Sequence, residues 1–155
     1  MRRARKPMLA AVLCVLAAGC GGGSSTTTST RSTFRAGYLK LRGPLNQTGT
    51  AIAAEITASP HQTDAQVASA FAGLAGRFHR QLATLEALKP PPSLSSAFAA
   101  ATTGATRMDA DLRAVSVAAT KHDADAARKA TAALGRDLTA TGVGAAQIKR
   151  SLGIK

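Results

Sequence analysis

The chain has 155 residues, with 20 Lys and Arg against eight Asp and Glu, a formal net charge of +12. This length suits a single domain. It has no tryptophan, one tyrosine and four phenylalanines, so it lacks the aromatic residues on which nucleic-acid bases stack, and this argues against a nucleic-acid-binding protein.

The first nineteen residues have the layout of a secretory signal peptide. An apolar run, Met8 to Ala18, is followed by Gly19 and Cys20 and is preceded by a basic start made of Arg2, Arg3, Arg5 and Lys6. A helix that crosses the ~30 Å hydrocarbon core of a bilayer needs roughly 20 apolar residues. The run is too short for that, so we expect residues 1–19 to be a cleaved signal and not a membrane span.

The stretch "LAAGC", Leu16 to Cys20, resembles the lipobox of bacterial lipoproteins. Ala18, Gly19 and Cys20 match that motif, whereas Ala17 stands where leucine is more usual. The resemblance implies cleavage between Gly19 and Cys20, a thioether-linked diacylglycerol on Cys20, and further acylation with a fatty acid such as palmitate. It also implies attachment to the extracytoplasmic face of the cell membrane. The alternative is an ordinary signal peptide with an accidental cysteine.

Processing of this kind would use both cysteines. Cys14 would be removed with the signal, and Cys20 would carry the lipid. The remaining chain would then have no disulfide and no cysteine ligand for zinc. It would keep sixteen Lys and Arg against eight acids, about +8 by count. Export also argues against a nucleic-acid partner.

Residues 20–33 are predicted to form a lipidated cysteine and a flexible tether. Gly21 to Thr33 consists mainly of Gly, Ser and Thr and has no hydrophobic period. Such a stretch behaves as a flexible chain with an r.m.s. span of ~20 Å. The folded domain is therefore expected to occupy residues 34–155.

Four segments of this domain have apolar residues at spacings of three and four, over 34–56, 67–88, 94–119 and 127–152. This spacing is typical of helices that pack in a bundle. Helices of about 25 residues would each be ~37 Å long. Because the connections are short, neighbouring helices should be antiparallel. We predict an all-α, up-down-up-down four-helix bundle.

The predicted helix boundaries have specific chemistry. Thr63 and Gln66 form a capping box before the second helix. The prolines at 90–92 cannot continue a helix. Asp123 and Asp125 place carboxylates at the start of the fourth helix, where they suit the helix dipole.

Two features leave the helix paths open. Pro44 lies inside the first of the four segments, 34–56, whose spaced apolar residues form a stripe along one helix face. It either kinks a continuous helix, which we favour, or splits it. Gly142 and Gly144 either break the fourth helix or let a neighbouring helix approach closely.

The antiparallel topology would gather basic residues at one end of the bundle. Glu86 would be the only acid there. Two interpretations remain open: this end faces an anionic membrane surface, or its cations merely suit helix C-termini and solvent. The possible membrane-facing residues are Arg31, Arg35, Lys40, Arg42, Lys89, Lys149, Arg150 and Lys155.

No arrangement typical of catalysis or metal binding occurs in the sequence. His61, His79 and His122 lie on separate segments without the Glu-x-x-His spacing of di-iron bundles. His79 and Met108 could in principle face one another as haem ligands, but surface and core positions explain them better. Asp109 with Asp111, and Asp123 with Asp125, are two residues apart and point away from each other on a helix. We expect no catalytic residue, metal or cofactor.

The domain resembles small Ala-rich helical lipoproteins of high-GC Gram-positive bacteria, which have no assigned activity, with "LKPP" (88–91) as the hinge between the second and third helices. The leading expectation is a non-enzymatic module that binds an envelope protein or supports envelope structure. The alternative is a carrier of a small molecule or lipid. A core filled by large side chains would favour the protein-binding module. A cavity of a few hundred Å³ would favour the carrier of a small molecule or lipid. The expected filling residues are Phe34, Phe71, Phe78, Phe98 and Met108.

Overall fold

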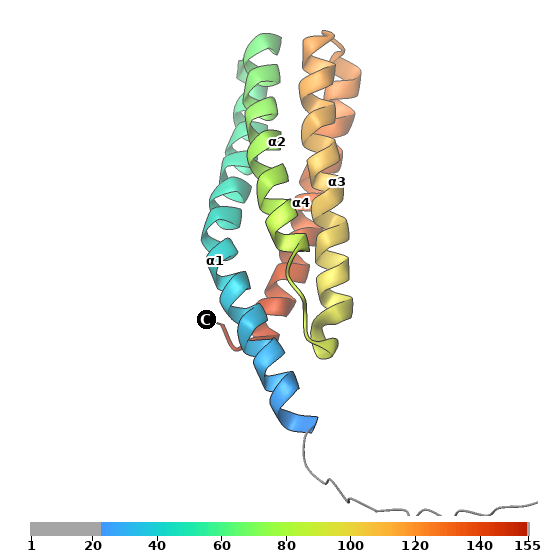
Figure 1. Ribbon diagram of the computed structural model, residues 1–155. Coiled ribbons are helices and arrows are strands. Elements are labelled where there is room, and N and C mark those ends of the chain that lie inside the picture. Colours follow the sequence, from blue (N-terminus) through green and yellow to red (C-terminus); the bar gives the residue numbers. More distant parts are fainter. Residues whose placement is uncertain (1–22, 155) are drawn as a thin grey trace, which may run out of the picture.

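The computed structural model describes residues 23–154 and is a bundle of four α-helices. Helices α1 (Gly23–Ala58), α2 (Asp64–Glu86), α3 (Ser95–Thr120) and α4 (Ala124–Ser151) follow one another in chain order. They run alternately up and down, and the described residues contain no strand (Figure 1). The predicted all-α four-helix bundle is confirmed.

The helix boundaries follow the chemistry predicted for them. The Thr63 hydroxyl accepts a hydrogen bond from the Gln66 amide, and the Gln66 side chain accepts from the Thr63 amide, so the capping box is complete. The Asp123 carboxylate accepts from the Ala126 amide and caps α4. Short 3₁₀ turns, η1 (Ser59–His61) and η2 (Pro92–Leu94), fill two of the connections. Each contains proline, which has no amide proton to continue an α-helix.

The first helix begins earlier than predicted. It starts at Gly23 and continues without interruption into the bundle, so the expected tether over 20–33 is helical from Gly23 onward. Once packing has fixed a helical nucleus, each added residue gains a backbone hydrogen bond, which favours extension through residues of modest helix propensity. The proposed signal 1–19, Cys20 and Lys155 lie outside the described residues.

Helix α1 is continuous through Pro44, as favoured from the sequence. Proline leaves the carbonyl of the residue four positions earlier without its helical donor. The early part of α1 leans relative to the later part in Figure 1. The Gln81 side chain of α2 donates a hydrogen bond to the Pro44 carbonyl at 3.2 Å and ties the two helices together beside the proline.

The core consists of two clusters along the bundle axis, and both lie within residues 34–154. The larger cluster is centred on Ile52, Phe71 and Leu112, all fully buried. The smaller one fills the end where α1 enters the bundle and includes Phe34, Phe98 and Ile148. Every predicted apolar position of α3 is buried, and so are most of those of α2. The apolar positions of α2 and α3 therefore form much of the core, whereas in the fourth segment, 127–152, only Leu134, Ile148 and Leu152 are buried. Thr48 is fully buried on the α1 stripe without a partner for its hydroxyl.

Helix α3 lies between α2 and α4 and packs against both, while α1 lies mainly against α2. Small residues bring α3 and α4 close together. A Cβ atom placed on Gly104 would lie 2.6 Å from the Thr141 hydroxyl oxygen, and one on Gly144 would lie 3.4 Å from the Ala101 Cβ. Because α4 is continuous across Gly142 and Gly144, these glycines do not break it.

Candidate functional site

Contacts between the helix ends place several of the predicted basic residues at the same end of the bundle. Arg31 near the start of α1 donates a hydrogen bond to the Ser151 carbonyl at the end of α4, at 2.5 Å. The Tyr38 hydroxyl donates to the Ala145 carbonyl at 3.4 Å. Lys89, in the connection between α2 and α3, lines a groove with Phe34 of α1. We call this end the basic pole; its described cations are Arg31, Arg35, Lys40, Arg42, Lys89, Lys149 and Arg150.

Aromatic packing fixes the helices of the basic pole. The Phe34 ring meets the Phe98 ring edge-on at a centroid distance of 5.4 Å, and it stacks near Tyr38 at 6.1 Å. All three rings are buried. Burial raises the pKa of the Tyr38 hydroxyl, and the charge of Arg42 opposes this rise. The aromatic residues therefore hold the pole together from inside.

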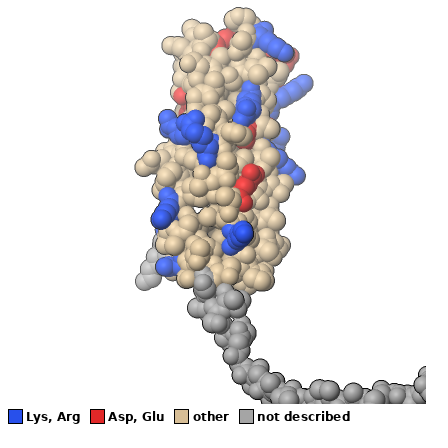
Figure 2. Space-filling view, viewed as in Figure 1, with Lys and Arg blue, Asp and Glu red and all other residues tan. Residues whose placement is uncertain are grey.

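The cations are unevenly placed along the pole. Arg31, Arg35, Lys89 and Arg150 are exposed, and Lys149 is partly exposed. Lys40 and Arg42 lie ~14–17 Å further along α1 than Arg31, at a rise of ~1.5 Å per residue. Figure 2 shows Lys and Arg side chains along one face of the bundle and near the end where α1 begins. The pole is therefore densest where α1 enters the bundle and α4 ends.

A groove of about 380 Å³ opens at the pole between the start of α1 and the end of α2. Phe34 and Leu88 give it apolar walls, and Lys89 stands at its edge. The sequence did not predict this recess, because it depends on how the turn after α2 sits against α1.

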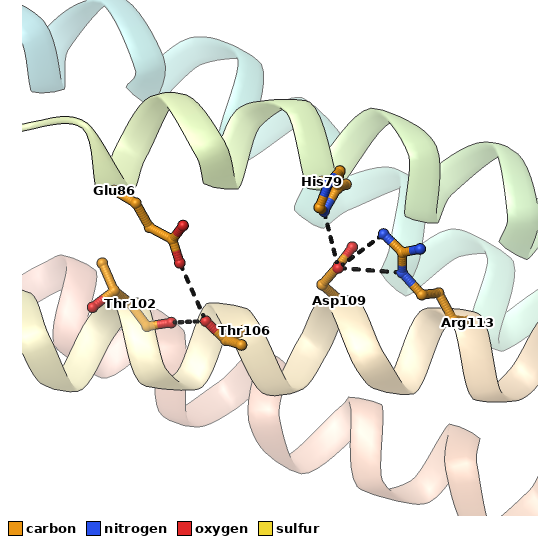
Figure 3. Close-up of polar contacts among 6 residues, drawn as sticks. All are labelled: His79, Glu86, Thr102, Thr106, Asp109 and Arg113. Atoms are coloured by element: carbon orange, nitrogen blue, oxygen red, sulfur yellow. Dashed lines mark hydrogen bonds and ion pairs between the residues drawn. The ribbon is translucent and has the colours of Figure 1, made fainter.

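A polar cluster joins α2 to α3 midway along the bundle (Figure 3). One oxygen of the Asp109 carboxylate contacts His79 Nδ1 at 3.2 Å and accepts from Arg113 Nε and Nη2 at 3.2 and 3.1 Å. Closer to the basic pole, the Thr106 hydroxyl lies 3.5 Å from Glu86 and donates to the Thr102 carbonyl at 3.0 Å. The contacts of Asp109 with His79 and of Thr106 with Glu86 join α2 to α3.

The haem-ligand alternative for His79 and Met108 finds no geometric support. Met108 is buried in the core, whereas the His79 side chain is 59% exposed and contacts Asp109. A groove of about 550 Å³ beside His79 is lined by Arg80, Arg113 and small residues of α2.

Two carboxyl groups that sequence reasoning did not pair meet between α3 and α4. Asp111 faces Asp137, and burial together with the neighbouring Asp137 raises the pKa of Asp111, while Arg136 opposes the rise. Each aspartate directly precedes a leucine of its helix stripe, Leu112 and Leu138. That shared position beside the stripes was the available signal. It is not visible among aspartates that lie close together in the sequence.

The remaining histidines lie away from this pair. His122, in the α3–α4 turn, contacts the Asp64 carboxylate at 2.7 Å, at the end opposite the basic pole. His61 is exposed in η1. Within residues 23–154, no group of three or more His, Cys, Asp or Glu side chains is arranged to hold a metal ion.

Over the same part of the chain, no helix combines the length and apolar character needed to span a bilayer. The chain matches no protein-family model, no curated protein and no solved structure.

Proposed function

We propose that the protein is a lipid-anchored, non-enzymatic helical module on the extracytoplasmic face of the cell membrane, where it binds an envelope protein or supports envelope structure. The anchoring part of this proposal is supported by the sequence "LAAGC" after a basic and apolar start. More than one acyl chain on Cys20 would hold the module stably at the membrane.

The observation that carries the module proposal is the filled core. Phe34, Phe71, Phe78, Phe98 and Met108 are at most 7% exposed. These are the large side chains that would have to line any ligand chamber between the helices. They pack against their neighbours in the two core clusters, and of the five only Phe78 and Met108 also line a groove between α1 and α4. Binding is therefore assigned to the outer surface of the bundle.

One observation favours the alternative, a small-molecule or lipid carrier. A solvent-open groove of about 390 Å³ runs between α1 and α4, with Phe78 and Met108 in its lining. Its size falls within the range of small-molecule sites. An apolar ligand could enter there by moving α1, which packs less extensively against α4 than α3 does.

Site-specific photo-crosslinking in native membranes separates the two functions. The photoreactive residue would replace Val117 or Val143, which are 51% and 65% exposed and contribute little to the core. Lys129, an exposed charged position on α4, provides the matched control.

If the module binds a protein partner, the photoreactive residue at position Val117 or Val143 should give one crosslinked species in stoichiometric yield. Mass spectrometry would identify that species. The chain with Cys20→Ser should lose that species if anchoring brings the partner within reach. The module proposal would be contradicted by absence of a crosslink together with recovery of one defined lipid or small molecule in about equimolar amount. That result would establish the carrier.

A further inference from the structure

We propose that the basic pole is an adsorption surface for anionic lipid headgroups, so that the bundle itself, and not only its lipid, contacts the membrane. This inference deepens the proposed function by naming what the pole faces. It concerns the protein surface alone, and its test uses a chain without the acyl group.

The two ends of the bundle differ in charge. The described part of the basic pole has seven Lys and Arg against Glu86, a net charge of +6. The opposite end has three cations against four acids, a net charge of −1. Its residues are Lys121, Arg128, Lys129, Glu55, Asp64, Asp123 and Asp125. The charge of the protein is therefore unevenly distributed along its long axis, and the positive end is the one where α1 begins.

Ion pairing reinforces this asymmetry. Arg113 and His79 contact Asp109 in the middle of the bundle, and Arg128 contacts Asp125 at the opposite end. Arg31 of the basic pole instead bonds a neutral backbone carbonyl, so its charge is not cancelled by that contact. The ion pairs of Asp109 and Asp125 thus lie away from the pole.

The burial of the aromatic rings favours lipid over nucleic acid as the partner. Single-stranded nucleic acid is bound by basic grooves with exposed aromatic side chains on which bases stack. At the pole, Phe34, Tyr38 and Phe98 are all buried and offer no such platform. A diffuse anionic surface needs only exposed cations, and each contributes ~1 kcal/mol close to it.

The path of α1 is compatible with this contact. Gly23 and Arg31 are ~12 Å apart along the helix, at a rise of ~1.5 Å per residue. That distance is comparable to the Debye length, ~8 Å at physiological ionic strength. An upright α1 would hold Arg31 beyond one Debye length from the surface and Lys40 and Arg42 further still, so screening would weaken their attraction. The start of α1 slants relative to the bundle (Figure 1). A tilted approach would shorten the distance between the cations of the pole and the surface.

The test uses the chain from residue 20 onward with the substitution Cys20→Ser, which contains both core clusters. It measures whether this protein sediments together with lipid vesicles. Vesicles of phosphatidylcholine alone are compared with vesicles that also contain about 30% phosphatidylglycerol, at low and at high salt. One triple variant removes pole charges, Arg35→Gln, Lys149→Gln and Arg150→Gln. The matched control removes the same charge from the opposite end, Lys121→Gln, Arg128→Gln and Lys129→Gln. Circular dichroism confirms that each variant is helical.

We expect binding only to the anionic vesicles, and we expect high salt to abolish it. The pole variant should bind on the order of 100-fold more weakly, since three charges at ~1 kcal/mol each make roughly that factor. The control should change by less than about threefold. The proposal fails if the chain binds neutral and anionic vesicles equally well, or if the two triple variants lose the same amount of vesicle binding. It also fails if the chain binds a polyanion such as single-stranded DNA in preference to the vesicles. None of these results bears on whether Cys20 is acylated.

Discussion

Asp111 of α3 and Asp137 of α4 show how a single contact can make stability depend on pH. Burial and the facing carboxylate raise the pKa of Asp111, and Arg136 on the same side opposes the rise. A carboxyl group whose pKa is raised on folding binds more protons in the folded state. Its contribution to stability is therefore greatest below the ordinary aspartate pKa of 3.8, and it is lost as the pH rises through the folded-state pKa.

Asp111→Asn should accordingly stabilise the bundle at neutral pH, because it removes a charge that faces Asp137. The gain should shrink as the pH falls toward about 3.5, where the wild-type carboxyl group is itself neutral. Urea denaturation of both proteins at several pH values measures this difference.

Asp109→Asn serves as the control of opposite sign. This change weakens the contacts with His79 and Arg113 and should cost up to about 1 kcal/mol at neutral pH, in the range of partly exposed ion pairs. A pH-independent effect of Asp111→Asn, or a destabilising one at neutral pH, would show that the carboxyl pair has no such role.

At the scale of the helices, glycines have different roles according to their surroundings. A Cβ on Gly135 would meet no atom within 4 Å, whereas one on Gly104 would lie 2.6 Å from the Thr141 hydroxyl oxygen. The next atoms of Thr141 lie at 3.7 and 3.8 Å, which is ordinary contact. The α3–α4 approach is thus limited at Gly104 by one oxygen atom.

Gly135→Ala should therefore stabilise the bundle by about 1 kcal/mol through helix propensity alone. Gly104→Ala should give no gain or a loss, since overpacking costs about 1–3 kcal/mol. In a Thr141→Ala background, Gly104→Ala should recover the gain seen at Gly135. Thermal or urea unfolding of the four variants measures these differences. Equal stabilisation by Gly104→Ala in both backgrounds would mean that the close approach imposes no constraint.

Helix spacing, caps and core were predictable because each depends on neighbours in sequence. The stripes of α2 and α3 and the Thr63–Gln66 capping box are local patterns. The start of α1 was not predictable in this way. Its Ser- and Thr-rich residues have no helical period, and their helix is an extension of one that packing stabilises further along. The Asp111–Asp137 contact depends on how two helices are rotated against each other, which local patterns do not determine.

At the scale of the whole molecule, the antiparallel topology places cations from distant parts of the sequence at one end of the bundle. Arg31, Lys89 and Lys149 are far apart in the sequence, and antiparallel packing brings them to one end. This grouping followed from short connections alone and was predicted. The grooves beside the pole and between α1 and α4 could not be predicted, because each is lined by residues of different segments whose mutual placement local sequence patterns do not determine.

The most direct test of the proposed function is whether Cys20 carries lipid. Bacterial cells that process lipoproteins would express the full chain, or its Cys20→Ser variant, in the presence of a clickable fatty-acid analogue. We expect the wild-type chain to be labelled and to stay with membranes after a high-salt wash, and we expect the variant to be unlabelled and released by that wash. Secretion of an unlabelled wild-type protein, cleaved elsewhere than before Cys20, would contradict the lipid-anchored module.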